Sequence, residues 1–299
     1  MTTGSQLQSQ LQRPIQTISL SRSDTTEQPI TLNQGAKGWN IATTLGNSIY
    51  FGTHVFSFPG GAGTGSIYKQ TNGVGSFEII PATDGLWQGM TTLGNNVYAA
   101  RRPAGSLTGQ IFMQTNGTGA FVSLNQTSRQ YYGMTSLGNK VYVCVAGGDI
   151  FVQTGGVGDF VALQQENRNW VAMCTLGNDV YAAVSGGDIY QQVGGQGNFL
   201  PLGQTTRTWS SLVTLGNDIY ASSGSEVYKR TGSVGDFRFL FTTAGLTVLT
   251  ALGNDLYFGS YSSDIFKLTI LPDAEKTFSF PTHNLQTGDQ VFQASSSPT

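Results

Sequence analysis

The sequence predicts an all-β protein built from six similar units. One phrase, Leu-Gly-Asn followed by a variable residue, a β-branched residue or leucine, and tyrosine, occurs six times. Only 11% of the residues are charged and 40 of the 299 are glycine, which suits short strands joined by tight turns. No helical period of apolar residues is present. The copies are 37 to 48 residues apart and begin at Leu45, Leu93, Leu137, Leu176, Leu215 and Leu252.

The fourth unit gives the clearest order of elements. Its β-rich runs are expected at 170–175, 180–184, 189–192 and 199–202, separated by glycine-rich turns. Gly177-Asn178 predicts a tight hairpin, because glycine adopts positive φ without steric cost. A tyrosine or phenylalanine recurs in the second and third runs of the units, which indicates packing between units. Four antiparallel strands in about 40 residues are typical of one blade of a β-propeller, so six units predict six blades.

The last unit, residues 246–271, has only three of its four strands. The missing strand is expected at the other end of the chain, because Ile30 to Leu32 precede Trp39 by the same offset as Ala162-Leu163 precede Trp170. We therefore predict that the N-terminal segment forms the outer strand of the last blade and closes the ring, which removes exposed sheet edges. An open solenoid is the alternative, but it requires distinct capping units.

Three segments follow from this pattern. Residues 1–28 are polar and form an N-terminal extended arm, residues 29–271 form the propeller, and residues 272–299 form a C-terminal tail with a short strand–turn–strand over 278–291. The arm is expected to be disordered or ordered only against a partner. Insertions at 53–65 and 101–109 lengthen the same turn of the first two blades.

Composition excludes several function classes. A net charge of −2 argues against a nucleic-acid or anionic membrane surface, and no apolar run is long enough to predict membrane insertion. The N-terminus lacks the pattern of a secretory signal. Cys144 and Cys174 lie in predicted strands and are expected to be buried free thiols, with a disulfide or metal site as the less favoured alternative. No metal or cofactor is predicted.

The sequence predicts no enzyme. It has no nucleophile–base motif, and its two histidines, His54 and His283, lie in an insertion and in the tail. Acidic residues do recur before the third strand of four units, where paired carboxylates could act as in glycosidases. A recurrent acidic residue at a turn more often caps backbone N–H groups, and we favour that interpretation. These residues are Asp149, Asp188, Glu226 and Asp264.

A glutamine, a cation and an aromatic residue recur at fixed spacing just before the first strand of four units. An aromatic face can stack on a sugar while amide and guanidinium groups bind its hydroxyls, so this set is a candidate glycan site. The alternative is structural: the aromatic ring packs between blades, the cation stacks on it, and the glutamine ties its loop to the neighbouring backbone. The candidates are Gln34, Lys37, Trp39, Gln126, Arg129, Tyr131, Gln165, Arg168, Trp170, Gln204, Arg207 and Trp209.

The same end of the ring is expected to carry both insertions. Arg101-Arg102 and the loop from His54 to Phe58 would make that end asymmetric. One decorated end and two polar terminal segments are typical of an interaction module.

Two segments carry a resemblance. The repeat at Gly148 to Leu163 resembles propeller repeats of bacteriophage tail-fibre and other virion surface proteins, and His283 to Val291 resembles a segment of phage tail and fibre proteins. The resemblance implies a virion structural or host-attachment protein, assembled in the host cytoplasm, whose terminal arms bind other virion proteins in a homo- or hetero-oligomeric assembly. Host-surface glycans are a further implied partner. Propeller lectins of the tachylectin-like and tectonin groups share the architecture, so a carbohydrate-binding lectin is the alternative. An intracellular scaffold of the WD type is a weaker one, since its Trp-Asp dipeptide is missing.

Overall fold

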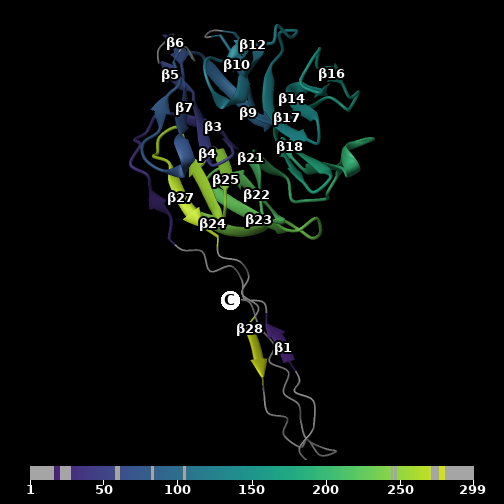
Figure 1. Ribbon diagram of the computed structural model, residues 1–299. Helices are drawn as coiled ribbons and strands as arrows, with labels where there is room; N and C mark the ends of the chain where they lie inside the picture. The colour runs from purple at the N-terminus through teal and green to yellow at the C-terminus, as the bar shows by residue number, and fades with distance from the viewer. Residues whose placement is uncertain are drawn as a thin grey trace, which may run out of the picture. The chain divides into compact units, whose positions relative to one another are not determined.

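A computed structural model describes residues 17–20, 28–57, 61–81, 84–103, 106–243, 245, 248–270 and 276–279 of the chain. The chain divides into two compact units: residues 26–270, and residues 1–25 together with 271–299. The described residues of the larger unit lie mainly in strands, and those of the smaller unit are two strands (Figure 1). Among the described residues no helix has the length and apolar character needed to cross a bilayer.

The larger unit consists of antiparallel four-stranded groups. The first two contain β3 (Trp39–Leu45), β4 (Ser48–Thr53), β7 (Ile67–Gln70) and β8 (Glu78–Ile79), then β9 (Leu86–Leu93), β10 (Asn96–Arg102), β11 (Gln110–Gln114) and β12 (Val122–Ser123). The third and fourth contain β13 (Tyr131–Leu137), β14 (Lys140–Gly148), β15 (Ile150–Thr154) and β16 (Val161–Ala162), then β17 (Arg168–Leu176), β18 (Asp179–Gly187), β19 (Ile189–Gln192) and β20 (Leu200–Pro201). The fifth contains β21 (Arg207–Leu215), β22 (Asp218–Ser223), β23 (Glu226–Thr231) and β24 (Arg238–Thr242). Short pairings of β14 with β17 and of β18 with β21 join the third, fourth and fifth groups into one twelve-stranded sheet.

The last group combines both ends of this unit. It contains β25 (Val248–Leu252), β26 (Asp255–Gly259), β27 (Phe266–Thr269) and β2 (Ile30–Thr31) in the sheet order β2-β27-β26-β25. Ile30 pairs with Lys267 and Thr31 with Phe266, and the N–H of Leu32 donates to the carbonyl of Ile265 over 2.9 Å. The outer strand of the last sheet is thus β2, at the N-terminal end of this unit.

The first strand of each group packs against the first strand of the next. The contacts run from β3 to β9, β13, β17, β21 and β25, and β25 in turn packs against β3 (Figure 1). From the second to the fourth group this approach leaves no room for a larger residue at two positions. A Cβ added at Gly89 would lie 1.8 Å from the carbonyl oxygen of Tyr132, and one at Gly133 would lie 2.5 Å from the Cα of Ala172.

Aromatic clusters fill the space between successive groups. Trp39 makes edge contacts with Phe51 and Tyr68, and Trp209 does so with Tyr228. The tyrosines of the repeated phrase are buried in the same layers, which confirms that the repeated aromatic residues pack between units. These tyrosines are Tyr50, Tyr98, Tyr142, Tyr181, Tyr220 and Tyr257.

The repeated phrase also sets the spacing between units at their other end. The turn Thr115–Gly117 of the second group reaches back to the first, where the carbonyl of Gly117 accepts a hydrogen bond of 3.2 Å from the hydroxyl of Tyr50. Gly117 has φ of 61°, and a Cβ there would lie 2.5 Å from Leu45. Glycine is needed at this position for both conformation and space.

Two smaller pairings lie outside this pattern. The first insertion forms a hairpin of β5 (Val55–Ser57) and β6 (Gly61–Thr64). In the smaller unit, β1 (Thr17–Leu20) pairs antiparallel with β28 (Lys276–Ser279). The sequence does not predict that these terminal segments pair with each other. The strand–turn–strand expected over 278–291 lies outside the described residues beyond Ser279.

The two cysteines are as predicted. Cys144 and Cys174 are buried free thiols in β14 and β17. Burial raises the pKa of each thiol to about 12, so both are unreactive as nucleophiles.

Candidate functional site

The aromatic residues of the predicted glycan site belong to the core. Trp39, Tyr131, Trp170 and Trp209 are between 0% and 4% exposed. The ring of Trp170, for example, lies edge-on to Tyr190 with 5.0 Å between centroids. A ring must expose its face to stack on a sugar, so the prediction that these four aromatic residues bind a ligand is corrected.

The glutamines connect neighbouring units. Gln165 accepts a hydrogen bond of 2.9 Å from the N–H of Phe199 in the next group, and its own amide donates to the carbonyl of Leu163 over 3.0 Å. The other three repeat this contact between groups, and they do so in the pairs Gln34 with Phe77, Gln126 with Phe160 and Gln204 with Phe237. This is the structural alternative that the sequence left open.

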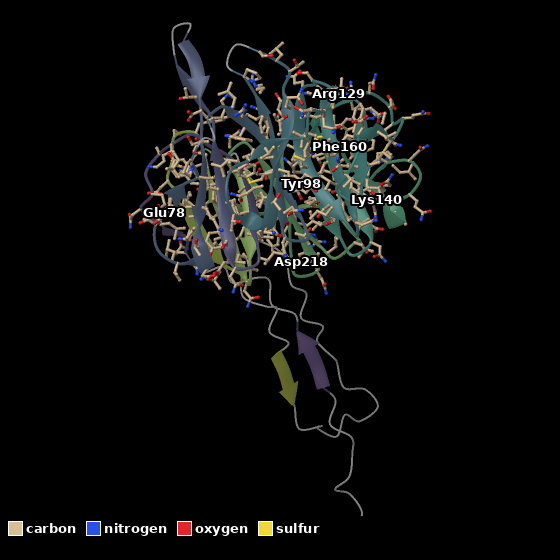
Figure 2. The ribbon with its side chains drawn as sticks, turned by 45° about the horizontal axis from the view of Figure 1, so that its top comes forward. Glu78, Tyr98, Arg129, Lys140, Phe160 and Asp218 are labelled. Atoms are coloured by element: carbon tan, nitrogen blue, oxygen red, sulfur yellow. The ribbon has the colours of Figure 1, made fainter. Side chains whose placement is uncertain are left out.

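The cations cover the aromatic residues from outside. Arg168 lies 4.7 Å from the ring centroid of Tyr190, and the equivalent pairs are Lys37 with Tyr68, Arg129 with Phe151 and Arg207 with Tyr228. The second group has Gly85 at this position, and Arg101 from its insertion lies over Phe112 instead, at 4.1 Å. Arg129 marks this end of the strands in Figure 2, and Asp218 marks the opposite end.

The recurrent acidic residues bind backbone N–H groups. Asp149 accepts from the N–H of Ile150 at 2.6 Å and from the N–H of Gln165 at 2.8 Å. Asp188 and Asp264 make the same pair of contacts with the corresponding residues, whereas Glu226 accepts from the hydroxyl of Tyr228. These carboxylates shape turns, as favoured from the sequence. Among the described residues no three histidine, cysteine or acidic side chains come together as a metal site.

A cavity of about 400 Å³ opens at the end where the first strands begin, which is within the size range of small-molecule sites. Residues from all six groups line it. They are Asn40, His54, Gln88, Arg102, Tyr132, Asn169, Val171, Ser185, Thr208, Trp209, Ser210 and Tyr261, and we refer to this space as the polar cavity.

Apolar side chains lie deeper between the first strands. The middle of these strands contributes Met90, Met134, Met173, Leu212 and Leu249. At the far end a smaller space of about 180 Å³ is lined in part by threonines, which include Thr44, Thr91, Thr135, Thr175, Thr214 and Thr250. The polar cavity is the larger of the two spaces.

Side chains in the polar cavity hold one another in place. The hydroxyl of Tyr261 donates to Oδ1 of Asn40 over 2.7 Å, and Nδ2 of Asn40 donates to the carbonyl of Trp87 over 2.8 Å. Nε2 of Gln88 lies 3.1 Å from Nδ1 of His54. The His54 and Tyr261 rings meet edge-on with centroids 6.0 Å apart. One wall of the cavity is therefore preorganised.

The charge of the polar cavity comes from Arg102. Burial, together with the neighbouring Arg102, lowers the pKa of His54 to about 4, so this histidine is neutral near pH 7. Burial, followed by the nearby Tyr132, raises the pKa of Tyr261 to about 12, so the phenol also stays neutral. None of the described lining residues is acidic. Arg102 carries a permanent positive charge.

The sequence predicts that this end of the strands carries both insertions, but it does not predict the cavity. His54 and Arg102 belong to these two insertions and to no repeated motif. The missed signal is variation within the repeat: the residue after the first-strand aromatic differs in every described unit. It is Asn40, Gln88, Tyr132, Val171 and Ser210 in turn, and all five line the cavity. Repeats that agree at packing positions and differ at one position indicate a single asymmetric site.

Comparison with known structures agrees on the fold. Virginiamycin B lyase from Staphylococcus aureus matches with a TM-score of 0.56 at 12% identity, covering 83% of this chain and 100% of that one. YCF48 from Cyanidioschyzon merolae matches with a TM-score of 0.54 at 12% identity, covering 85% and 88%. The computationally designed protein Ika8 matches with a TM-score of 0.51 at 12% identity, covering 81% of this chain and 98% of that one. No protein-family model and no curated protein matches the sequence. The fold is that of a β-propeller, and identities this low carry no information on activity.

Proposed function

We propose that this chain is a non-enzymatic six-bladed β-propeller that serves as a structural or host-attachment component of a bacteriophage virion. The polar cavity supports a binding role best, because side chains of different types from all six groups converge on it. A preorganised surface lowers the entropic cost of binding, and the Asn40–Tyr261 and Gln88–His54 contacts preorganise one wall of the cavity.

The six-bladed ring is supported by contacts between the first and last groups. β25 packs against β3 as the other first strands pack against their neighbours. The carboxylate of Asp264 accepts from the N–H of Gln34, and Gln34 in turn accepts from the N–H of Phe77. The same relay from acid to glutamine to the next group runs through Asp149, Gln165 and Phe199. A repeat contact that recurs across the chain ends is expected of a closed ring.

The non-enzymatic role is supported by the state of the acidic residues. Asp149, Asp188 and Asp264 each bind two or more backbone N–H groups, which leaves them poorly suited to exchange protons with a substrate. His54, the histidine of the polar cavity, is kept neutral by burial.

The virion role is supported by the resemblance of residues 148–163 and 283–291 to phage fibre proteins. Pairing of β1 with β28 is consistent with it, because residues 17–20 and 276–279 form a two-stranded ribbon whose edges are available to a neighbouring subunit. An isolated two-stranded ribbon is marginally stable in water, so a partner that extends it would stabilise it. We propose that the partners of the terminal segments are other virion proteins.

The test is the location of the chain in purified particles. Antibodies raised against recombinant residues 26–270 should label, in electron micrographs, virus particles purified from a culture that expresses this chain. The full chain should be incorporated, whereas a chain reduced to 26–270 should fold but stay unincorporated. Recovery of the chain only outside the particles would contradict the virion role.

A carbohydrate-binding lectin is the second candidate. The buried aromatic rings no longer favour the repeated glutamine, cation and aromatic sets as its sites. The polar cavity favours it, since Tyr132 and Tyr261 offer aromatic surface beside amides and hydroxyls.

A further inference from the structure

We propose that the polar cavity is a single site for a carbohydrate that carries a carboxylate, with Arg102 as the residue that binds the carboxylate. The inference rests on the proposed attachment function and names the ligand class of the site. This proposal differs from the glycan sites predicted at the repeated glutamine, cation and aromatic sets. Those sets would give several equivalent sites, whereas the polar cavity is one asymmetric site.

Arg102 is positioned for an anion. It ends strand β10, is partly exposed, and donates from Nη1 to the carbonyl of Ser106 over 2.7 Å, which orients the side chain. The guanidinium has five N–H donors, and among the described residues it forms no ion pair. A carboxylate matches the fork of such donors and binds it through two parallel hydrogen bonds. With His54 neutral and no acidic residue in the described lining, no other charge competes.

The rest of the lining fits a polyhydroxylated ligand. Asn169, Ser185, Thr208 and Ser210 present amide and hydroxyl groups that can both donate and accept. Tyr261 is 41% exposed and Tyr132 is partly exposed, so each can offer aromatic surface to the C–H groups of a sugar ring. Apart from the rings, Val171 is the apolar side chain in the described lining. A peptide would need apolar pockets for its side chains, so these observations favour a sugar.

The contrast with the other cations of this end supports the assignment to Arg102. Arg101, Arg129, Arg168 and Arg207 lie over aromatic rings of the core, 4.1 to 4.7 Å from the nearest ring centroid. Arg102 lines the polar cavity instead. Its neighbour Arg101 packs over the Phe112 ring, whereas the Arg102 guanidinium is available to bind a ligand in the cavity.

The experiment uses the full chain and a glycan array that contains sialylated, uronic-acid-containing and neutral oligosaccharides. We expect binding to carboxylated glycans, and the sialylated and uronic arms will identify the source of the carboxylate. Reducing the carboxylate to an alcohol should weaken binding at least tenfold. Arg102→Met should do the same, whereas Arg168→Met, which changes a cation outside the cavity, should bind within about twofold of the unchanged chain. Melting temperatures of both variants establish that each is folded.

Three results would overturn the proposal: no binding to any carboxylated glycan, equal binding to the reduced glycans, or unchanged binding by folded Arg102→Met. Binding of an acidic peptide in preference to every glycan would also overturn it. The virion role fails separately. Particles that contain the chain but show no glycan binding contradict only the cavity assignment, and glycan binding by a chain missing from particles contradicts only the virion role.

Discussion

The carboxylate of Asp264 accepts a hydrogen bond of 2.7 Å from the backbone N–H of Gln34, which lies 230 positions earlier in the sequence. Asp149 and Asp188 make the same contact with glutamines only 16 positions away. The local geometry is therefore repeated while the chain connection is not. The contact between Asp264 and Gln34 joins the N-terminal segment to the last group of strands, in the same way that Asp149 and Asp188 bind the glutamines that follow them.

Removal of the N-terminal strand should destabilise the larger unit. A chain that begins at residue 33 loses the pairing of β2 with β27 and the hydrogen bond from Leu32 to Ile265, whereas a chain that begins at residue 26 keeps both. At about 1 kcal/mol per hydrogen bond, with the apolar contact of Leu32 in addition, we expect a loss of roughly 3 kcal/mol. Thermal unfolding of the two chains measures the difference. Equal melting temperatures would contradict the role of β2.

Gln165→Ala should destabilise the protein by about 1–3 kcal/mol, because it leaves the N–H of Phe199 without its acceptor. Gln196→Ala is the matched control, since the Gln196 side chain is exposed and makes no hydrogen bond within the part of the chain that the structure describes. Urea unfolding of both variants measures the two free energies. If Gln165→Ala were as stable as Gln196→Ala, the glutamine would not stabilise the contact between groups.

Gly89→Ala should destabilise the protein by about 3 kcal/mol. The added Cβ would lie 1.8 Å from the carbonyl oxygen of Tyr132, so β9 and β13 would have to separate. Ser211→Ala is the control at the equivalent position of the fifth group. There a Cβ already fits and only the hydrogen bond from the N–H of Leu249 is lost, at a cost of about 1 kcal/mol. A Gly89→Ala protein with an unchanged unfolding midpoint would show that the first strands tolerate wider spacing.

His54 should make stability depend on pH below neutrality. Its pKa is about 4 in the folded protein, because burial and Arg102 disfavour the charged ring, against 6.5 for an ordinary histidine. Between these values the unfolded chain binds more protons, so stability falls as pH decreases from about 6.5 to about 4 and loses no more to this group below that. Urea unfolding across this range should give a shallower loss for His54→Gln than for the unchanged chain. Parallel curves would contradict the low pKa.

Much of the fold could be predicted because its signals are local and repeated. The Leu-Gly-Asn turns and the tyrosines after them mark each pair of strands. The distance from Ile30 to Trp39 along the chain predicts that Ile30 lies in the outer strand of the last group. Pairing of β1 with β28 was not predicted. It joins segments about 260 positions apart, and neither contains a repeated pattern that could be compared with another copy.

The site was harder to predict because its residues are neighbours only in space. Residues equivalent to Gln165 and Trp170 recur at fixed spacing, and this regular spacing predicts a ligand site. In the structure Trp170 packs in the core and Gln165 binds the neighbouring group. Arg102 and Tyr261 come from different groups and belong to no motif. Spacing alone also does not reveal burial, and burial separates an aromatic residue that stacks on a ligand from one that fills the core.

The sheet β2-β27-β26-β25 contains residues from both ends of the larger unit, and this affects how the protein is made. During synthesis Ile30 and Thr31 leave the ribosome early, but the strand they pair with, Phe266–Thr269, is among the last to emerge. The earlier groups can form as they appear, while the last one waits for the end of translation. Until then the nascent chain presents an unpaired strand, so a ribosome stalled before residue 266 would hold an incomplete propeller that is prone to associate with other chains.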